Sequence, residues 1–591
     1  MTTGAVPQAG PRWTRLLELL HDRDWDQGGT LMIAGAVIGL ASGLGVIAFY
    51  KLIDASHALF VRWPEQHSPW IGQAILRVVV TAFGLWLAWF LVRRAGIGEG
   101  QNVPDVQRSV ARLGGIIPFR AVAVRTIASS VTLGSGGSAG SEGPVAVLGA
   151  AVGSRLGRGL RFQPRHLKIL VGCGAAAGIA GAFNAPFAGA FFALEEILGS
   201  FSVGAFSPVV IASVVGALTV STALGTHPAF SIPDTTDLHP VVNTMLYPLL
   251  GIACGLASAL YVRLDLAMPR FVRRLPGPMW VRPLLGGVVV AGITLASGGL
   301  LAGDGHLAIP APVFGQMHWY LLLALSLAKI VATVVTLGSG GSGGVFTPAL
   351  FIGAALGGGV GRLLNLAVPG HVIHPASWAL VGMAGLVSGA TRAPLTAIFI
   401  VYELTNNASF VAPLMIVSVV AFVTARRFSP HGLYDGWLAA RGEHLAHGVD
   451  VAVMEQLSVR DAIDRDAPFA APGMPLGAMA ELMGDARVAA LPVVDELGVV
   501  LGVVISHDLH EALLQPVAAR QLLIAADLAV GVEPLRERQT LRDALAQMSA
   551  AGRDALPVIA EDDGSGATPF VGVLTRAAAF NAYDRALEHA V

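Results

Sequence analysis

The chain has little charge for its length. Asp, Glu, Lys and Arg make up 13% of its 591 residues, whereas 54% of the residues are hydrophobic and the mean hydropathy is +0.65. A soluble domain is usually about a quarter charged. Apolar stretches of about 20 residues, long enough to cross a bilayer, recur between residues 29 and 423. The deficit of charge therefore predicts a polytopic membrane domain, and a net charge of −1 argues against nucleic-acid binding.

The sequence is also poor in patterns that form disulfides, metal sites or catalytic centres. Its two cysteines, Cys173 and Cys254, both fall in apolar stretches, which predicts buried thiols without a disulfide. The 16 histidines show no paired metal-ligand spacing, so we expect no metal and no required cofactor. The sequence contains no nucleophile–base pairing, phosphate loop or redox cluster, which favours a protein that is not an enzyme.

Lys and Arg are absent from two loops, residues 226–242 and 302–318. The positive-inside rule assigns basic loops to the cytoplasm, and it therefore places both termini there, in a cell-membrane protein (the inner membrane, in a bacterium). Residues 1–28 are polar, lack a signal peptide and predict a cytoplasmic amphipathic helix over Arg12–Trp25. The basic loops carry Arg155, Arg158, Arg161, Arg165 and Lys168, then Arg263, Arg270, Arg273, Arg274 and Arg282, and finally Arg426 and Arg427.

A Gly-rich run, LGSGGSAGSEGP over residues 133–144, lies between apolar segments and contains Glu142. A helix is expected to begin just behind it at Pro144, since Pro is favoured at the first helical position. The N–H groups that open a helix lack intrahelical partners and attract anions. The nearest anion is the chain's own Glu142, which predicts a gate in which a tethered carboxylate competes with a free anion.

The membrane region repeats itself. Residues 133–144 return at 337–348 with eight of twelve positions identical, and residues 184–196 return at 392–404. The offsets of 204 and 208 indicate one duplication, with repeats over about 29–225 and 242–434. Corresponding Gly-interrupted segments in two halves indicate a midplane binding site in a transporter, and we expect residues 169–200 and 338–348 to be broken rather than continuous helices. Glu195 pairs with Glu403, but Glu196 pairs with Leu404.

The composition changes after Arg427. Residues 435–450 are predicted to form a linker, and residues 451–591 a soluble α/β region. This region is itself duplicated, because residues 474–494 match 539–559 at an offset of 65. We expect two tandem domains, over about 451–515 and 522–591.

Taken in order, these signals resemble the CLC family of chloride channels and proton-coupled chloride exchangers, followed by a pair of CBS domains. The resemblance implies an all-α membrane protein with two inverted-topology repeats, joined to a cytoplasmic α/β CBS tandem. It also implies a homodimer with one pore in each subunit, and chloride or a similar anion as the bound substrate. The signals are Gly140-Ser141-Glu142-Gly143-Pro144, Gly344-Val345-Phe346-Thr347-Pro348, Asn184-Ala185-Pro186 with Glu195-Glu196, Tyr434, and the duplicated tail.

The resemblance also assigns roles to individual residues. Glu142 corresponds to the family's gating glutamate, and Glu196 to the internal proton-transfer glutamate of its exchangers. Val345 and Phe346 correspond to residues whose backbone N–H groups hold the central anion, and Tyr434 to the tyrosine that closes the site from the cytoplasm. Together the two glutamates favour coupled anion/proton exchange. A passive anion channel is the alternative, in which Glu196 is an ordinary acid at a helix end.

Two departures from the family pattern leave the choice of anion open. Aligning Pro104 with the proline of the family's first motif puts Gln101 where the family has Ser (or Pro in nitrate-selective members) and Asn102 where it has Gly. An amide NH₂ can still hold an anion, so chloride, nitrate and other halides remain candidates. Ser141 replaces the basic residue common before the gating Glu, which weakens the local attraction for anions.

The tail keeps only half of each nucleotide motif. CBS pairs often bind adenine nucleotides through a Gly-h-h-Thr-x-x-Asp strand end, where h is apolar. The first copy keeps Asp508 but has Ile505 at the Thr position, and the second keeps Thr575 but has Ala578 at the Asp position. Adenine nucleotide binding and a purely structural module both remain open.

Two other classes of function are disfavoured. A regulator in which the membrane part only transmits a signal from the tail would not need an anion site in both repeats. A cation transporter with CBS domains would need midplane acids without Gly-rich helix starts, whereas the repeated Gly-Ser-Gly-Gly-Ser runs favour an anion.

Overall fold

The computed structural model describes residues 27–67, 72–96, 102–225, 240–304, 317–367, 374–441, 443, 457–486, 488, 490–561 and 569–590. The expected N-terminal amphipathic helix and Gln101 lie outside the described residues, as do both loops that lack Lys and Arg, apart from their ends. The chain divides into two compact units, which we call the membrane unit (Met1–Leu445) and the tail unit (Ala446–Val591).

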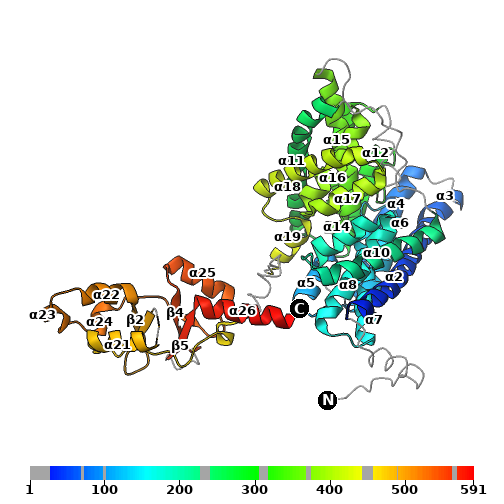
Figure 1. The fold of residues 1–591 in the computed structure, drawn as a ribbon. Coiled ribbons are helices and arrows are strands. Elements are labelled where there is room, and N and C mark those ends of the chain that lie inside the picture. Colours follow the sequence, from blue (N-terminus) through cyan, green and yellow to red (C-terminus); the bar gives the residue numbers. More distant parts are fainter. Residues whose placement is uncertain are drawn as a thin grey trace, which may run out of the picture. The chain divides into compact units, whose positions relative to one another are not determined.

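In the described residues of the membrane unit, the regular elements are all helices (Figure 1), apart from one isolated bridge between Gly140 and Gly344. Eight helices there are long and apolar enough to cross a bilayer. The first repeat contains α2 (Gln27–His57), η1 (Ala58–Arg62), α3 (Trp63–His67), α4 (Gln73–Arg94), α5 (Val103–Arg112), α6 (Phe119–Gly134), α7 (Glu142–Gly159), α8 (Pro164–Phe183), α9 (Pro186–Phe192), η2 (Ala193–Ile197) and α10 (Val203–Leu224). The second contains α11 (Pro240–Arg274), α12 (Val281–Ala296), α14 (Trp319–Gly338), α15 (Phe346–Ala367), α16 (Pro375–Thr391), α17 (Pro394–Thr405), η4 (Ala408–Phe410) and α18 (Val411–Phe428), followed by α19 (Leu433–Ala439).

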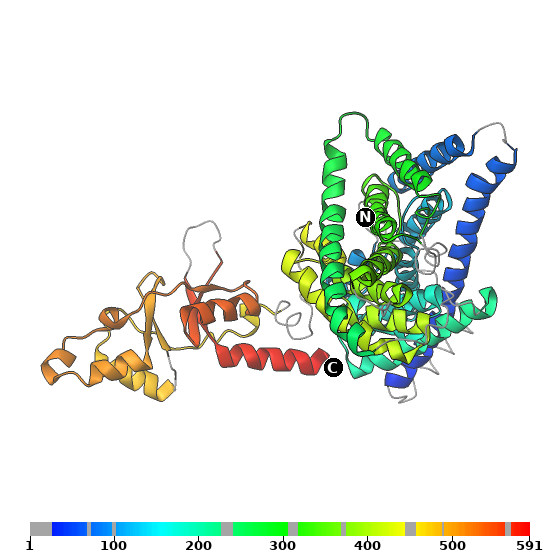
Figure 2. The ribbon, with the colours of Figure 1, turned by 90° about the horizontal axis from the view of Figure 1, so that it is seen from above.

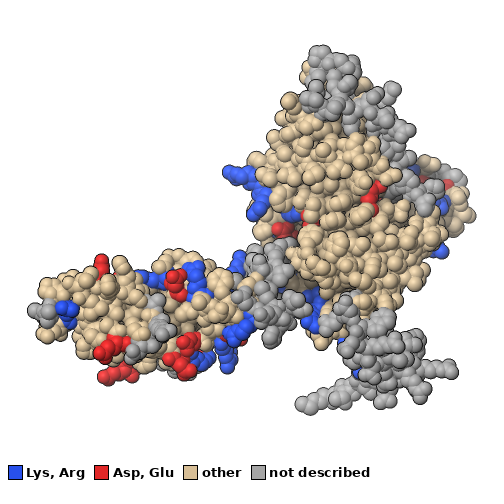
Figure 3. Space-filling view, viewed as in Figure 1, with Lys and Arg blue, Asp and Glu red and all other residues tan. Residues whose placement is uncertain are grey.

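The two repeats pack in the same way. In the first, α7 packs on α8 and α2 on α10; in the second, α15 packs on α16 and α11 on α18. The repeats meet through α4 with α12 and through α9 with α17, and they occupy adjacent regions of the unit (Figure 2). Figure 3 shows that the face of this unit turned toward the viewer carries few charged side chains, as a lipid-facing surface requires.

Reciprocal hydrogen bonds relate the repeats by a local twofold axis. The Ser138 N–H donates to the Thr336 hydroxyl at 3.1 Å, and the Ser342 N–H donates to the Thr132 hydroxyl at 3.1 Å. The two bonds correspond through the duplication, because Ser342 lies 204 residues after Ser138 and Thr336 lies 204 residues after Thr132.

One expectation about the broken segments is corrected by α8. Residues 169–200 were expected to be interrupted at their glycines and at Asn184-Ala185-Pro186. The expectation is wrong for the glycines, because α8 runs unbroken through Gly174 to Phe183. The glycines serve close packing instead, because a Cβ added at Gly174 would lie 1.9 Å from the carbonyl oxygen of Gly149 on α7. The break comes at Asn184, which is left-handed with φ 52°, and its counterpart Arg392 is left-handed with φ 72°.

The ends of two other segments also differ from expectation. The helix α7 begins at Glu142 rather than at Pro144. The helix α19 continues to Ala439, five residues into the range 435–450 that the sequence assigns to a linker. Cys173 and Cys254 are buried and free, as expected.

The tail unit contains two small sheets, one for each copy of its repeat. In the first, β1 (Ala490–Val494) pairs antiparallel with β2 (Val500–Ile505). In the second, β4 (Ala555–Ile559) pairs antiparallel with β5 (Phe570–Thr575) and parallel with β3 (Leu535–Arg536), and the register shifts at the corresponding step in both copies. The accompanying helices are η5 (Val459–Asp461), α21 (Leu476–Ala486), α22 (Ser506–Leu513), α23 (Val517–Arg520), α24 (Ala525–Leu528), α25 (Leu541–Ala551) and α26 (Arg576–Ala590).

The close approach of α7 and α8 yields a stability prediction. Gly174→Ala should destabilise the membrane unit by about 1–3 kcal/mol, because its Cβ would overlap backbone that cannot move away cheaply. Gly292→Ala, on α12, is the matched control, since its Cβ would meet nothing within 4 Å. Thermal unfolding in detergent checks this: a lower melting temperature is expected for Gly174→Ala alone, and equal melting temperatures would contradict the packing described.

Candidate functional site

The two Gly-rich loops meet face to face. The Gly140 N–H donates to the Gly344 carbonyl oxygen and the Gly344 N–H donates to the Gly140 carbonyl oxygen, both at 2.7 Å. The helices that follow, α7 and α15, therefore begin close together, and a Cβ at Gly143 would lie 2.9 Å from the Cα of Gly344. Two helix N-termini with unpaired N–H groups thus face one small volume.

The Glu142 carboxylate occupies that volume. Its Oε1 accepts a hydrogen bond from the Phe346 N–H at 2.5 Å, and its Oε2 accepts one from the Thr347 hydroxyl at 2.6 Å. The side chain is 1% exposed. Glu142 therefore binds the start of α15 in the opposite repeat, whereas the sequence suggested the start of its own helix. The reason is geometric, because side chains on a helix lean toward its N-terminus and the first residue projects beyond the end.

The glycines of both motifs make room for this carboxylate. A Cβ at Gly140 would lie 2.2 Å from either carboxylate oxygen of Glu142, and a Cβ at Gly344 would lie 2.3 Å from Oε1. The repeated Gly residues are therefore a steric requirement of the site. Thr347 was expected only as part of the motif, and its hydroxyl proves to be a direct partner of the carboxylate.

The remaining residues expected at the anion site lie around the same point. Phe346 is 1% exposed, and its ring packs against Phe183 and Phe192 at centroid distances of 6.0 and 6.4 Å. Tyr434 is 6% exposed at the start of α19 and belongs to the same buried cluster as Phe346. The Val345 carbonyl accepts a hydrogen bond from the Tyr261 hydroxyl at 3.3 Å, a contact that the sequence did not predict.

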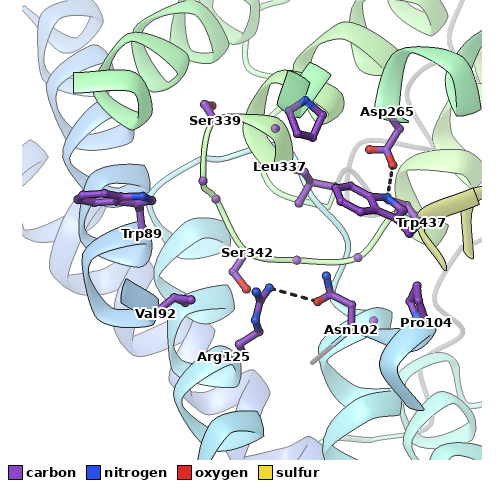
Figure 4. A pocket seen from close by; sticks show the side chains of 18 of the residues that line it. Trp89, Val92, Asn102, Pro104, Arg125, Asp265, Leu337, Ser339, Ser342 and Trp437 are labelled. Carbon is purple, nitrogen blue, oxygen red and sulfur yellow. Dashed lines mark hydrogen bonds between the residues drawn. The ribbon is translucent and has the colours of Figure 1, made fainter. Parts of the chain in front are cut away.

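A cavity of about 430 Å³ opens beside the two loops and is lined by Gly343, Gly344, Val345 and Tyr434 (Figure 4). Asn102 also lines it; its backbone N–H donates to the Asp105 carboxylate at 3.1 Å, and its amide oxygen accepts from Arg125 at 3.4 Å. Arginines outnumber acids in the lining, which favours the entry of anions. The charged lining residues are Arg93, Arg125, Arg273, Arg282 and Arg441, with Asp105 and Asp265.

Glu196 lies in a second buried polar site. It is 6% exposed in the π-helical turn η2, and the Gln107 amide donates to its Oε2 at 3.0 Å and to its carbonyl oxygen at 2.8 Å. Such π-helical turns are frequent at functional sites. Gln107 lies on α5, three residues after Pro104, and sequence reasoning did not identify it.

The neighbouring Glu195 has a different role. Its carboxylate accepts from the N–H groups of Leu395 and Thr396, at 3.2 and 2.8 Å, at the start of α17. Glu403 does the same in reverse, accepting from Phe187 and Ala188 at 2.9 and 2.8 Å at the start of α9. These paired caps join the repeats. Glu195 therefore has the role of a helix cap. Glu196 has no carboxylate counterpart in the second repeat.

In the tail unit, the two expected nucleotide contacts are placed on helix starts. Asp508 lies half-buried in the first turn of α22. The Thr575 hydroxyl accepts from the Ala578 N–H at 3.0 Å and so caps α26. Capping accounts for Thr575 without a ligand, and nucleotide binding remains a prediction.

Comparison with known proteins gives the family. A family model of voltage-gated chloride channels matches residues 83–426, and a CBS domain model matches residues 459–515. The chain belongs to the CLC family. Its membrane unit is therefore that of a multi-pass CLC anion transport protein.

Individual CLC proteins support this assignment. A ClcB-like protein of Ralstonia nicotianae is 33% identical over 69% of this chain and 96% of the relative. An H⁺/Cl⁻ exchange transporter, ClcA of Cronobacter sakazakii, is 31% identical over 69% and 89%.

Solved CLC structures share the fold. A slow cyanobacterial Cl⁻/H⁺ antiporter matches with a TM-score of 0.63 at 24% identity, over 70% of this chain and 97% of the other. A eukaryotic CLC transporter matches with a TM-score of 0.61 at 20% identity, over 95% and 98% of the two chains.

The hydroxyl of Thr347 gives a prediction specific to the gate. Thr347→Val keeps the shape but removes the donor to Glu142 Oε2, so chloride should displace the carboxylate more easily. A hydrogen bond to a charged group contributes about 1.5–3 kcal/mol, and the apparent chloride Kd should therefore fall by about ten- to a hundredfold when Glu142 is ionised.

Isothermal titration calorimetry with chloride checks the Thr347 prediction. In a Glu142→Ala background, Thr347→Val should leave the chloride Kd within about twofold, since the carboxylate is already gone. A rise in the chloride Kd in the Glu142→Ala background would mean that Thr347 binds the anion directly, and it would contradict the prediction.

Proposed function

We propose that the protein exchanges protons for chloride or a similar anion across the cell membrane, with Glu142 as the gate. The supporting observation is the buried Glu142 carboxylate held by the Phe346 N–H and the Thr347 hydroxyl. Donors that hold a carboxylate at a helix N-terminus also suit a free anion. An ionised Glu142 therefore competes with the anion for the Phe346 N–H at the start of α15.

Protonation of Glu142 opens the site in this mechanism. Both hydrogen bonds to the carboxylate are charge-assisted, and they weaken when the negative charge is lost. An anion then replaces the side chain at the start of α15, and the displaced carboxyl group carries one proton. Each passage of the anion thus requires a change in the protonation of Glu142, which couples the two movements.

Glu196 is proposed as the carrier that passes protons between Glu142 and the cytoplasm. Its burial in the turn η2 and its hydrogen bond from Gln107 fix the carboxyl group in a protein interior, where an isolated acid is costly and typically functional. The ClcA relative and the cyanobacterial structural neighbour are described as proton-coupled, which supports exchange over passive flow.

The transported anion that we propose is chloride, another halide or nitrate. Asn102 supplies an amide where the family has glycine, and its nitrogen faces the Gly-rich loop in Figure 4. A third solved relative, 26% identical with a TM-score of 0.58, is a fluoride/proton antiporter. The flux assay should therefore compare chloride, nitrate and other halides under the same conditions.

Three further proposals rest on the resemblance and on loop charge. The protein forms a homodimer with one transport pathway in each subunit. Both termini and the tail unit lie in the cytoplasm, on the side of the basic loops. The tail unit takes an adenine nucleotide near Asp508, for which titration of the full-length protein with ATP, ADP and AMP is the direct test.

Simultaneous recording of anion and proton movement from liposomes tests the exchange. Wild-type protein should move protons against an anion gradient, with a flux that rises as pH falls because Glu142 is protonated more often. Glu142→Ala should pass anions without protons and without that pH dependence. Glu196→Gln should lose at least about tenfold in proton flux while retaining anion flux.

The matched control for Glu196→Gln is Glu195→Gln. In that variant an amide oxygen still accepts from the start of α17, so proton coupling should persist. Anion flux by wild type with no proton movement would identify a passive channel. Loss of coupling in both variants alike would remove the special role given to Glu196.

A further inference from the structure

Tyr261 is a buried tyrosine on α11 that reaches the anion site through its hydroxyl. Its side chain is 0% exposed, and its hydroxyl donates to the Val345 carbonyl oxygen at 3.3 Å. It belongs to the same buried cluster as Phe346 and Tyr434. Nothing in the apolar pattern of α11 distinguishes it from an ordinary core residue.

The contact falls on the peptide unit that holds the gate. The Val345 carbonyl and the Phe346 N–H belong to one planar, trans peptide, so they point in opposite directions. On one side the Tyr261 hydroxyl donates to the carbonyl, and on the other the N–H donates to Glu142 Oε1 at 2.5 Å. The tyrosine, the peptide and the carboxylate therefore form one continuous hydrogen-bonded chain.

Hydrogen bonds in such a chain strengthen one another. A donor to a carbonyl polarises the peptide and makes the N–H at its other end a better donor, and the effect is larger where water is excluded. The same contact fixes the rotation of the peptide and so the direction of the N–H. Both effects act on whichever anion occupies the site, Glu142 or a free ion.

The first repeat lacks a hydroxyl at the corresponding position, and the neighbouring Tyr50 hydroxyl donates to the Ala182 carbonyl oxygen at 3.2 Å. Tyr261 follows Gly255 by six residues, and Phe49 follows Gly43 by six residues; the two glycines pack on Thr424 and Thr219, which occupy corresponding positions in α18 and α10. Phe49 is 1% exposed, so it fills the same kind of buried position without a donor. The difference matches the division of roles, because α15 holds the anion whereas α7 supplies the gating carboxylate.

We propose that Tyr261 is a positioning residue of the anion site, which acts through the Val345–Phe346 peptide to strengthen and aim the N–H that binds the anion. The inference rests on the proposed function, since it assumes that a free anion replaces Glu142 at this N–H. It predicts that Tyr261 contributes to anion affinity without touching the anion.

A matched pair of variants tests this proposal. Tyr261→Phe removes the hydroxyl that contacts Val345. Tyr247→Phe is the control on the same helix: Tyr247 is 1% exposed, and its hydroxyl has no hydrogen-bond partner among the residues that the structure describes. Both changes delete one oxygen atom from a buried ring, so their effects on packing are alike. Each is made in a Glu142→Ala background, so that only the free anion competes for the site.

Chloride titration by calorimetry gives the first measure. Tyr261→Phe should raise the chloride Kd by about two- to tenfold, the range that corresponds to one hydrogen bond, and Tyr247→Phe should leave it within about twofold. In liposomes the apparent KM for chloride should rise for Tyr261→Phe with little change in the maximal rate. If Tyr261 had a purely structural role, Tyr261→Phe would lower the melting temperature and the maximal rate, and it would not raise KM selectively.

The outcomes distinguish this inference from the proposed function. No chloride binding by Glu142→Ala with Tyr261 intact would contradict the proposed function. Equal chloride affinity with Tyr261 and with Phe at this position would overturn the inference alone. A second variant covers a folding defect: 3-fluorotyrosine at position 261 keeps the hydroxyl as a stronger donor and should bind chloride at least as tightly as tyrosine, and weaker binding would overturn the proposal.

Discussion

The membrane unit depends on one interaction, the hydrogen bond from the Phe346 N–H to the Glu142 carboxylate across the repeats. It puts the negative charge of one repeat at the positive helix end of the other. Everything around it serves that contact: Gly140 and Gly344 leave space, the reciprocal backbone bonds between them hold the loops together, and Thr347 satisfies the second oxygen. In the function that we propose, this volume is an anion site filled by a tethered carboxylate, which leaves the site when Glu142 is protonated.

A symmetric scaffold carries an asymmetric site. The repeats share packing, left-handed breaks at Asn184 and Arg392, and the reciprocal caps made by Glu195 and Glu403. Two buried acidic residues lie at positions where the repeats differ. Glu142 corresponds to Phe346 and Glu196 to Leu404, so the carboxylates that we propose as gate and as proton carrier exist once each, as one directed pathway requires.

The sequence was enough to predict the duplication and the family, because those depend on motifs close together in the chain. It did not predict which helix start receives Glu142, since that depends on how two loops 204 residues apart meet. Gln107 and Tyr261 were missed for the same reason: each looks like a helix residue of no special kind until its partner is known. The glycines of α8 were misinterpreted because a packing glycine and a helix-breaking glycine read alike in a sequence.

The most direct test of the central claim is a crystal structure of Glu142→Ala protein soaked with bromide, read by anomalous scattering. The account predicts a bromide peak in the place of the missing carboxylate, within hydrogen-bonding distance of the Phe346 N–H at the start of α15. Bromide bound elsewhere in the membrane unit, with that position filled by water or side chain, would contradict the claim that Glu142 and the transported anion compete for one site.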